Sequence, residues 1–233
     1  MAGDPHVTDF EDRVAGIGSL ADDTRRALYR YVCSQPDPVS RDQAAAALSL
    51  PRHQAKFHLD RLEVAGLLQV EYARLTGRTG PGAGRPAKLY RRTSSPITVS
   101  LPERRYELAA ELMARAISRS TSTGTPVADA LTGAAREHGQ SLATGVDPAL
   151  ALRSATEVLA RNGYEPRPYD DGVQLANCPF DALAREHTAL VCGMNHALLS
   201  ALAGALAPDV LRAHLAPAAG RCCVLLTAGA ETT

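Results

Sequence analysis

The fold is decided by residues 40–92, which read SRDQAAAALSLPRHQAKFHLDRLEVAGLLQVEYARLTGRTGPGAGRPAKLYRR. Ser40 is followed three residues later by Gln43, a capping-box pattern that predicts a short helix over Arg41–Leu48. A Ser-Leu-Pro turn comes next, and its proline, Pro51, suits the first position of a second helix. Two helices joined by so short a turn are typical of a helix-turn-helix unit.

The second helix is followed by a pattern typical of a hairpin. We expect this helix over Pro51–Ala65, where apolar residues recur at helical spacing, with Gly66 placed to end it. A strand is expected over residues 67–72 and its antiparallel return over Lys88–Arg91. Between them, residues 77–86 contain four Gly and two Pro, too many for a strand, and predict a wing tip.

Basic charge gathers in the same region of a chain whose formal net charge is zero. Residues 51–95 carry nine Lys or Arg and three acids, a net +6, whereas residues 142–233 carry six bases and nine acids, a net −3. A basic patch is the electrostatic footprint of a protein that binds the phosphate backbone. We therefore predict a winged helix-turn-helix domain over residues 11–95 that binds double-stranded DNA.

The side chains expected to meet DNA follow from this arrangement. The second helix of such a unit lies in the major groove with its first residues against base edges. Arg can bond bidentately to guanine, and Gln can do so to adenine. The predicted DNA-contacting residues are Arg41, Arg52, His53, Gln54, Lys56, Arg78, Arg85 and Lys88. A helical subdomain with a solvated basic face is the alternative interpretation.

Segments around this domain complete an α+β fold. Residues 1–10 read as a loose tail, and a helix is expected from near Ser19 until Pro36 ends it. Residues 94–102 read as a linker. They lead to a second domain, expected at residues 103–233 and expected to sense a signal and to dimerise.

The second domain is itself expected to combine helices with a sheet. Amphipathic patterns predict helices within residues 103–161, and the pattern changes to an α+β part at residues 163–228. The elements expected in that part are a hairpin over residues 164–177, a long helix over Pro179–Leu206 interrupted near Gly193, and a strand over Cys222–Thr227.

Composition favours a cytoplasmic, non-enzymatic protein. There is no apolar N-terminal segment typical of a secretory signal and no run of 18 apolar residues suited to a membrane span. No nucleophile, base and orienting residue form a recognisable set, so we expect no catalysis. In a cytoplasmic chain clustered cysteines are expected to bind metal or to react rather than to form structural disulfides, whereas Cys33 is expected in the core.

Two short runs carry a resemblance to known regulators. FHLDRL at Phe57–Leu62, followed by AGLL at Ala65–Leu68, resembles winged-helix regulators of the ArsR/DeoR-like class. GRPAKLY at Gly84–Tyr90 resembles the wing of the SufR-like branch, the iron–sulfur-assembly repressors. The resemblance covers roughly residues 18–92 and implies a repressor that reads a pseudo-palindromic operator as a homodimer. It also implies that His58 packs inside the domain rather than reading bases.

Four cysteines in the second domain extend this resemblance: Cys178, Cys192, Cys222 and Cys223. The resemblance implies a [4Fe–4S] cluster held by the first two and by one of the last two, with an unassigned fourth ligand. Thiolates from separate segments can converge on one metal centre. Zinc, which accepts three cysteines and a histidine, is one alternative. The other is no metal, in which case the second domain only dimerises or binds a small apolar effector.

Overall fold

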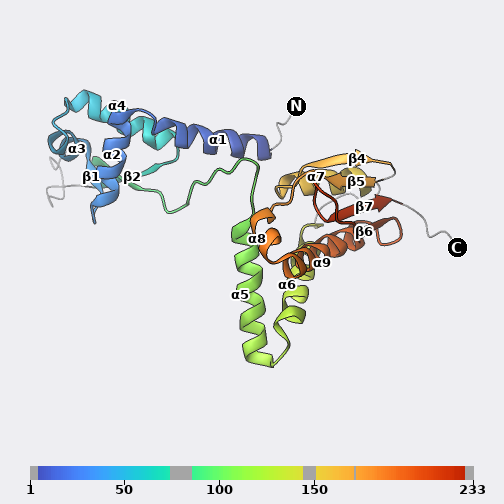
Figure 1. The fold of residues 1–233 in the computed structure, drawn as a ribbon. Helices are drawn as coiled ribbons and strands as arrows, with labels where there is room; N and C mark the ends of the chain where they lie inside the picture. Colours follow the sequence, from blue (N-terminus) through green and yellow to red (C-terminus); the bar gives the residue numbers. More distant parts are fainter. Residues whose placement is uncertain (1–4, 74–85, 144–150, 171, 229–233) are drawn as a thin grey trace. The chain divides into compact units, whose positions relative to one another are not determined.

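The structure, a computed structural model, describes residues 5–73, 86–143, 151–170 and 172–228 (Figure 1). The chain divides into two compact units, Met1–Val99 and Ser100–Thr233. Each unit has its own hydrophobic core. The mixed helix and sheet composition expected from the sequence is confirmed.

The described part of the N-terminal unit contains four helices and a small antiparallel sheet. Its elements are α1 (Pro5–Ser19), α2 (Asp23–Ser34), β1 (Val39–Ser40), α3 (Arg41–Ala47), α4 (Arg52–Val64), β2 (Leu68–Ala73) and β3 (Ala87–Arg92). The sheet has the order β1-β3-β2, with Val39 and Val70 both opposite Tyr90. Tyr90 is 1% exposed and joins the core formed by α2, α3 and α4.

Local signals in the sequence fix the ends of these helices. The capping box at α3 is present, because Ser40 Oγ accepts from the Gln43 N–H and the Gln43 side chain accepts from the Ser40 N–H. Gly66 follows α4 with a φ of +70°, a left-handed conformation in which glycine carries no steric cost. The expected helices and strands of this region are therefore confirmed. The expected wing tip, apart from Pro86, lies outside the described residues.

The expectation of a loose tail over residues 1–10 is wrong for residues 5–10, and residues 1–4 lie outside the described residues. Helix α1 already begins at Pro5, and a separate helix, α2, begins at Asp23. The expected single helix start near Ser19 is where α1 ends. Asp22 does not lie in the first turn of α2 but caps it, accepting from the Arg25 N–H at 2.8 Å. A capping carboxylate satisfies a backbone donor that the helix itself leaves free.

In its described residues, the C-terminal unit combines five helices with a second sheet. Its described elements are α5 (Tyr106–Thr123), α6 (Val127–Ser141), α7 (Ala151–Arg161), β4 (Pro166–Tyr169), β5 (Gly172–Leu175), α8 (Asp181–Glu186), α9 (Thr188–Leu206), β6 (Leu211–Leu215) and β7 (Val224–Ala228). The sheet is antiparallel throughout, in the order β4-β5-β7-β6. Helices α6 and α9 pack so closely that a Cβ on Gly139 would lie 2.1 Å from the Leu198 carbonyl oxygen.

Three details of this unit differ from the expectation. The long helix is divided at His187, whose backbone is not helical, and not at Gly193, which lies inside α9. Strand β6 was not expected at all. Strand β7 begins at Val224, so Cys222 and Cys223 precede the strand instead of lying on it. The expected hairpin is confirmed by the pairing of β4 with β5.

Helix α9 is the most apolar helix of the described chain. By length and by its mean hydropathy of 1.6 it could cross a membrane, yet half of that window is buried inside the C-terminal unit. Core helices of globular units commonly show both properties. Leu198, Leu199 and Leu202 are at most 1% exposed and form the centre of the unit's core.

Candidate nucleic-acid interface

Small residues let α3 and α4 pack closely, and this packing fixes the orientation of α4. Ala44 and Ala55 are both fully buried, and with no side chain beyond Cβ they allow the two helices to approach closely. The turn between them is held by the Leu50 N–H, which donates to the Ala45 carbonyl at 2.9 Å. Helix α4 then starts with the Ala55 N–H donating to the Pro51 carbonyl at 3.0 Å.

The first turn of α4 presents polar side chains on the face opposite its packed one. Arg52, His53 and Lys56 are exposed, and Gln54 is half-buried. Leu59 and Leu62, on the packed face, are fully buried. His58 is also buried, at 9% exposure, as the resemblance implied.

Asp42 on α3 lies between the two arginines of this surface. Its Oδ1 atom is 3.3 Å from Arg52 Nε and 3.6 Å from Arg41 Nε. The Arg52 side chain remains 76% exposed, so this pair is worth little to stability. The pair instead orients the Arg52 guanidinium. Because Asp42 lies beside Nε, the two terminal amino groups of Arg52 are left for another partner.

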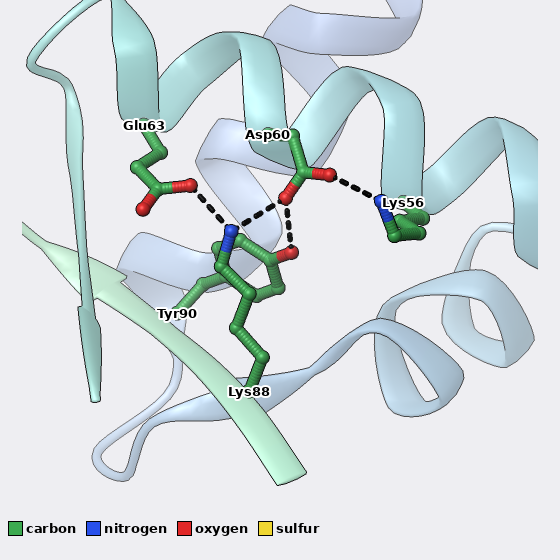
Figure 2. Close-up of polar contacts among 5 residues, drawn as sticks. All are labelled: Lys56, Asp60, Glu63, Lys88 and Tyr90. Carbon is green, nitrogen blue, oxygen red and sulfur yellow. Dashed lines mark hydrogen bonds and ion pairs between the residues drawn. The ribbon is translucent and has the colours of Figure 1, made fainter. Parts of the chain in front are cut away.

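A second carboxylate, Asp60, joins α4 to β3 (Figure 2). One Asp60 oxygen accepts from Lys56 Nζ at 2.7 Å, and the other accepts from Lys88 Nζ and from the Tyr90 hydroxyl, each at 2.7 Å. Glu63 accepts a further bond from Lys88 Nζ at 2.5 Å. We call these five residues the Asp60 cluster. It ties the helix to the strand that follows the expected wing.

Contacts within the Asp60 cluster shift the pKa values of Asp60, Lys88 and Tyr90. Burial alone would raise the pKa of Asp60, but the bonds from Lys56, Lys88 and Tyr90 outweigh it and hold that pKa at about 2. Burial would lower the pKa of Lys88, and its bonds to Asp60 and Glu63 instead raise it. Burial, reinforced by the bond to Asp60, raises the pKa of Tyr90. At neutral pH Asp60 is therefore an ionised carboxylate, Lys88 carries an ammonium group and Tyr90 is a neutral phenol.

The predicted DNA-contacting residues fall into three groups. Five of them lie on α3 or α4, and Arg41 and Arg52 there both pair with Asp42: Arg41, Arg52, His53, Gln54 and Lys56. Lys88 lies on β3 with its ammonium group turned to Asp60 and Glu63. Arg78 and Arg85 lie outside the described residues.

Sequence reasoning missed the carboxylates that organise this surface. Lys56 and Asp60 stand four residues apart on one helix, a spacing that by itself indicates an ion pair. The spacing of Asp42 and Arg52 does not indicate an ion pair, because the two residues lie on different helices. Nothing in the sequence joins Asp60 to Lys88, because the two meet only when β3 folds back beside α4.

The cysteines predicted as metal ligands do not gather as a set of four. Cys222 is buried in the core of the C-terminal unit, and Cys178 and Cys223 are partly buried and pack against that core. Cys192 lies on α9, half-buried, and no hydrogen bond joins it to the other thiols of the described chain. Among the described residues, no three His, Cys, Asp or Glu side chains form a group that could hold a metal ion. An iron–sulfur cluster needs several thiolates on one centre, so the cluster stays a prediction.

Comparison with known families agrees with the geometry of the N-terminal unit. Residues 20–71 match the family model described as a helix-turn-helix domain. The match spans α2, α3 and α4 and ends in β2. No curated protein matches the chain.

The N-terminal unit is therefore a helix-turn-helix domain. Such a domain supports DNA binding and a role in the regulation of transcription.

Proposed function

We propose that this protein is a cytoplasmic repressor of transcription that reads a pseudo-palindromic DNA operator as a homodimer. The observation that carries the proposal is the first turn of α4, where Arg52, His53 and Lys56 are exposed opposite a fully buried face. This is the surface that a helix-turn-helix unit places in the major groove. No catalytic step is part of the proposed function.

Arg52 and Gln54 are proposed to read bases. Asp42 engages Arg52 at Nε, 3.3 Å away, which leaves the two terminal amino groups to bond O6 and N7 of one guanine. Gln54 can donate to and accept from the edge of an adenine. Asp42 then acts as a positioning residue, since it orients the guanidinium without touching a base.

The hairpin of β2 and β3 is proposed to be the base of a wing. The Asp60 cluster fixes β3 to α4, so the segment between the strands leaves from a defined place beside the reading helix. Arg78 and Arg85 on that segment are proposed to contact phosphate or a minor groove. Lys88 is proposed to serve mainly as the tie between strand and helix.

A homodimer would place two copies of α4 in successive major grooves. Half-sites one helical turn apart, about 34 Å, are the spacing that such a dimer reads. The C-terminal unit is proposed to hold the dimer together. A repressor acts by occupying a site that the transcription machinery needs.

Metal binding by the C-terminal unit stays a separate prediction. No step of the proposed mechanism passes through a cluster, because the described thiols do not form a ligand group. Anaerobic purification followed by iron and sulfide analysis tests the prediction. Protein free of both contradicts it and leaves the C-terminal unit to dimerise or to bind a small apolar effector.

The proposed function is tested by selection from a library of random DNA duplexes with the full-length protein. We expect enrichment of an inverted repeat with half-site centres about one helical turn apart. Fluorescence anisotropy then gives the affinity for the selected duplex at several salt concentrations. Absence of any enriched sequence would contradict the proposal.

Variants separate base reading from phosphate binding. Arg52→Ala and Gln54→Ala are each expected to cost about 1–3 kcal/mol of discrimination at one base position. Replacing Arg78 and Arg85 by Ala should weaken binding to all sequences and reduce the salt slope. Arg153→Ala is the matched control, because Arg153 is also 76% exposed and also paired with one carboxylate, but lies in the C-terminal unit.

A further inference from the structure

Phe57 places an exposed aromatic ring on the polar face of α4. It follows His53 by four residues, so the two side chains lie on the same face of the helix. Phe180 is 1% exposed, as expected for a core phenylalanine, whereas Phe57 is 52% exposed. Val64, seven residues after Phe57 on α4, is exposed as well. Exposed apolar side chains that gather on one face, with polar groups around them, mark a site of interaction.

The surface around Phe57 forms an open hollow of about 290 Å³. It is lined by His53, Lys56, Phe57, Asp60, Arg61 and Val64. Both oxygens of Asp60 already accept hydrogen bonds, one from Lys56 and the other from Lys88 and Tyr90 (Figure 2). Lys56 and Arg61 add two positive charges to the same lining. The hollow therefore combines an apolar ring with a net positive rim, which suits a partner whose apolar groups lie between phosphates.

Neighbouring side chains hold the Phe57 ring in place. The guanidinium carbon of Arg61 lies 5.4 Å from the centroid of the ring, a cation–π contact. The ring of His58, which is buried, meets it edge-on with the two centroids 5.2 Å apart. The ring is thus oriented before any partner binds, and an oriented group loses less conformational entropy on binding.

We propose that Phe57 is a specificity-determining residue that contacts the 5-methyl group of a thymine in the major groove. The inference rests on the proposed function and deepens it, because it names a base that the same surface reads. The thymine methyl is the apolar group that base edges present in this groove, and the other groups there are hydrogen-bond donors and acceptors. A phenyl ring has neither donor nor acceptor, so the methyl is the group that it can recognise. Phe57 thereby favours a T·A pair over a C·G pair, since cytosine lacks the methyl.

The test removes the methyl group and nothing else. In the duplex selected by the full-length protein, each thymine is replaced in turn by deoxyuridine, together with its symmetry-related thymine in the other half-site. Fluorescence anisotropy compares each duplex with the parent. At one position we expect the wild type to lose affinity about 15-fold, from about 4-fold for one buried methyl group in each half-site.

Variants assign the methyl contact to Phe57. Phe57→Ala is expected to bind the thymine and deoxyuridine duplexes equally at that position. Phe10→Ala is the matched control, because Phe10 is a partly exposed phenylalanine of the same unit on a different helix, α1. It is expected to show the same loss as the wild type. The wild-type comparison decides the question even if Phe57→Ala fails to fold.

The outcomes separate this inference from the proposed function. Absence of any enriched sequence contradicts both. An enriched operator that has no thymine in its half-site, or none whose methyl matters to the wild type, overturns this inference alone. So does a Phe57→Ala protein that keeps the full deoxyuridine effect. If Phe57 instead joins two copies of the chain, Phe57→Ala shifts toward monomer in analytical ultracentrifugation with the methyl effect unchanged, which also overturns it.

Discussion

Replacing Asp60 by Asn removes the charge that joins α4 to β3 while keeping the size of the side chain. Asp60 has a pKa of about 2 in the folded chain against an ordinary 3.8. At about 1.4 kcal/mol per pKa unit, this shift corresponds to at most about 2.5 kcal/mol. The Asp60 side chain is 29% exposed, so solvent screening reduces the expected loss to about 1–2 kcal/mol at pH 7.

The pH dependence of this loss has a definite sign. The folded pKa of Asp60 lies below the unfolded one, so its contribution is complete above about pH 5 and is lost as the pH falls toward 2. The difference between Asp60→Asn and wild type is therefore expected to shrink over that range.

Native-state hydrogen exchange of the full chain, read by mass spectrometry on peptides from α4 and β3, measures the loss. Asp37→Asn is the control, because Asp37 is an exposed carboxylate in the same unit. Equal protection of Asp60→Asn and Asp37→Asn at pH 7 would refute the reasoning. So would a deficit that does not diminish as the pH is lowered.

Two further predictions concern packing and capping. Ser40→Ala should cost about 1 kcal/mol of stability in the N-terminal unit, seen as lower exchange protection of α3, because it removes the capping bond to the Gln43 N–H. Gly139→Ala should destabilise the C-terminal unit by about 1–3 kcal/mol in urea unfolding, because its Cβ would meet the Leu198 carbonyl. Gly193→Ala, in a helix with open space around it, should be neutral or stabilising by up to about 1 kcal/mol; a loss as large as that of Gly139→Ala would contradict this account.

The elements of the helix-turn-helix region were predictable because their signals are local. The capping box of Ser40 and Gln43 predicts the start of α3. Gly66 predicts the end of α4, where the chain adopts a positive φ. Helix α1 was not predicted because residues 1–10 were interpreted as a loose tail, although Phe10, Val14 and Ile17 recur at helical spacing. Strand β6 depends on pairing with β7, which local pattern does not reveal.

The candidate site was predictable only in part, for the same reason. The polar first turn of α4 follows from helical periodicity alone. The partners of Lys88 do not, because Asp60 lies 28 residues away and reaches it through the fold. The cysteines show the limit most clearly. The resemblance implied three cysteine ligands and an unassigned fourth, whereas among the described residues no three His, Cys, Asp or Glu side chains form a group that could hold a metal ion.

Base reading by the first turn of α4 is the core of the proposed function. It is tested most directly by comparing wild type, Arg52→Ala and Arg153→Ala by fluorescence anisotropy on the selected operator and on operators with one base pair changed. The account predicts that Arg52→Ala loses discrimination at one base pair by about 5- to 150-fold, while Arg153→Ala matches the wild type. Unchanged discrimination in Arg52→Ala, or an equal loss in Arg153→Ala, would contradict it.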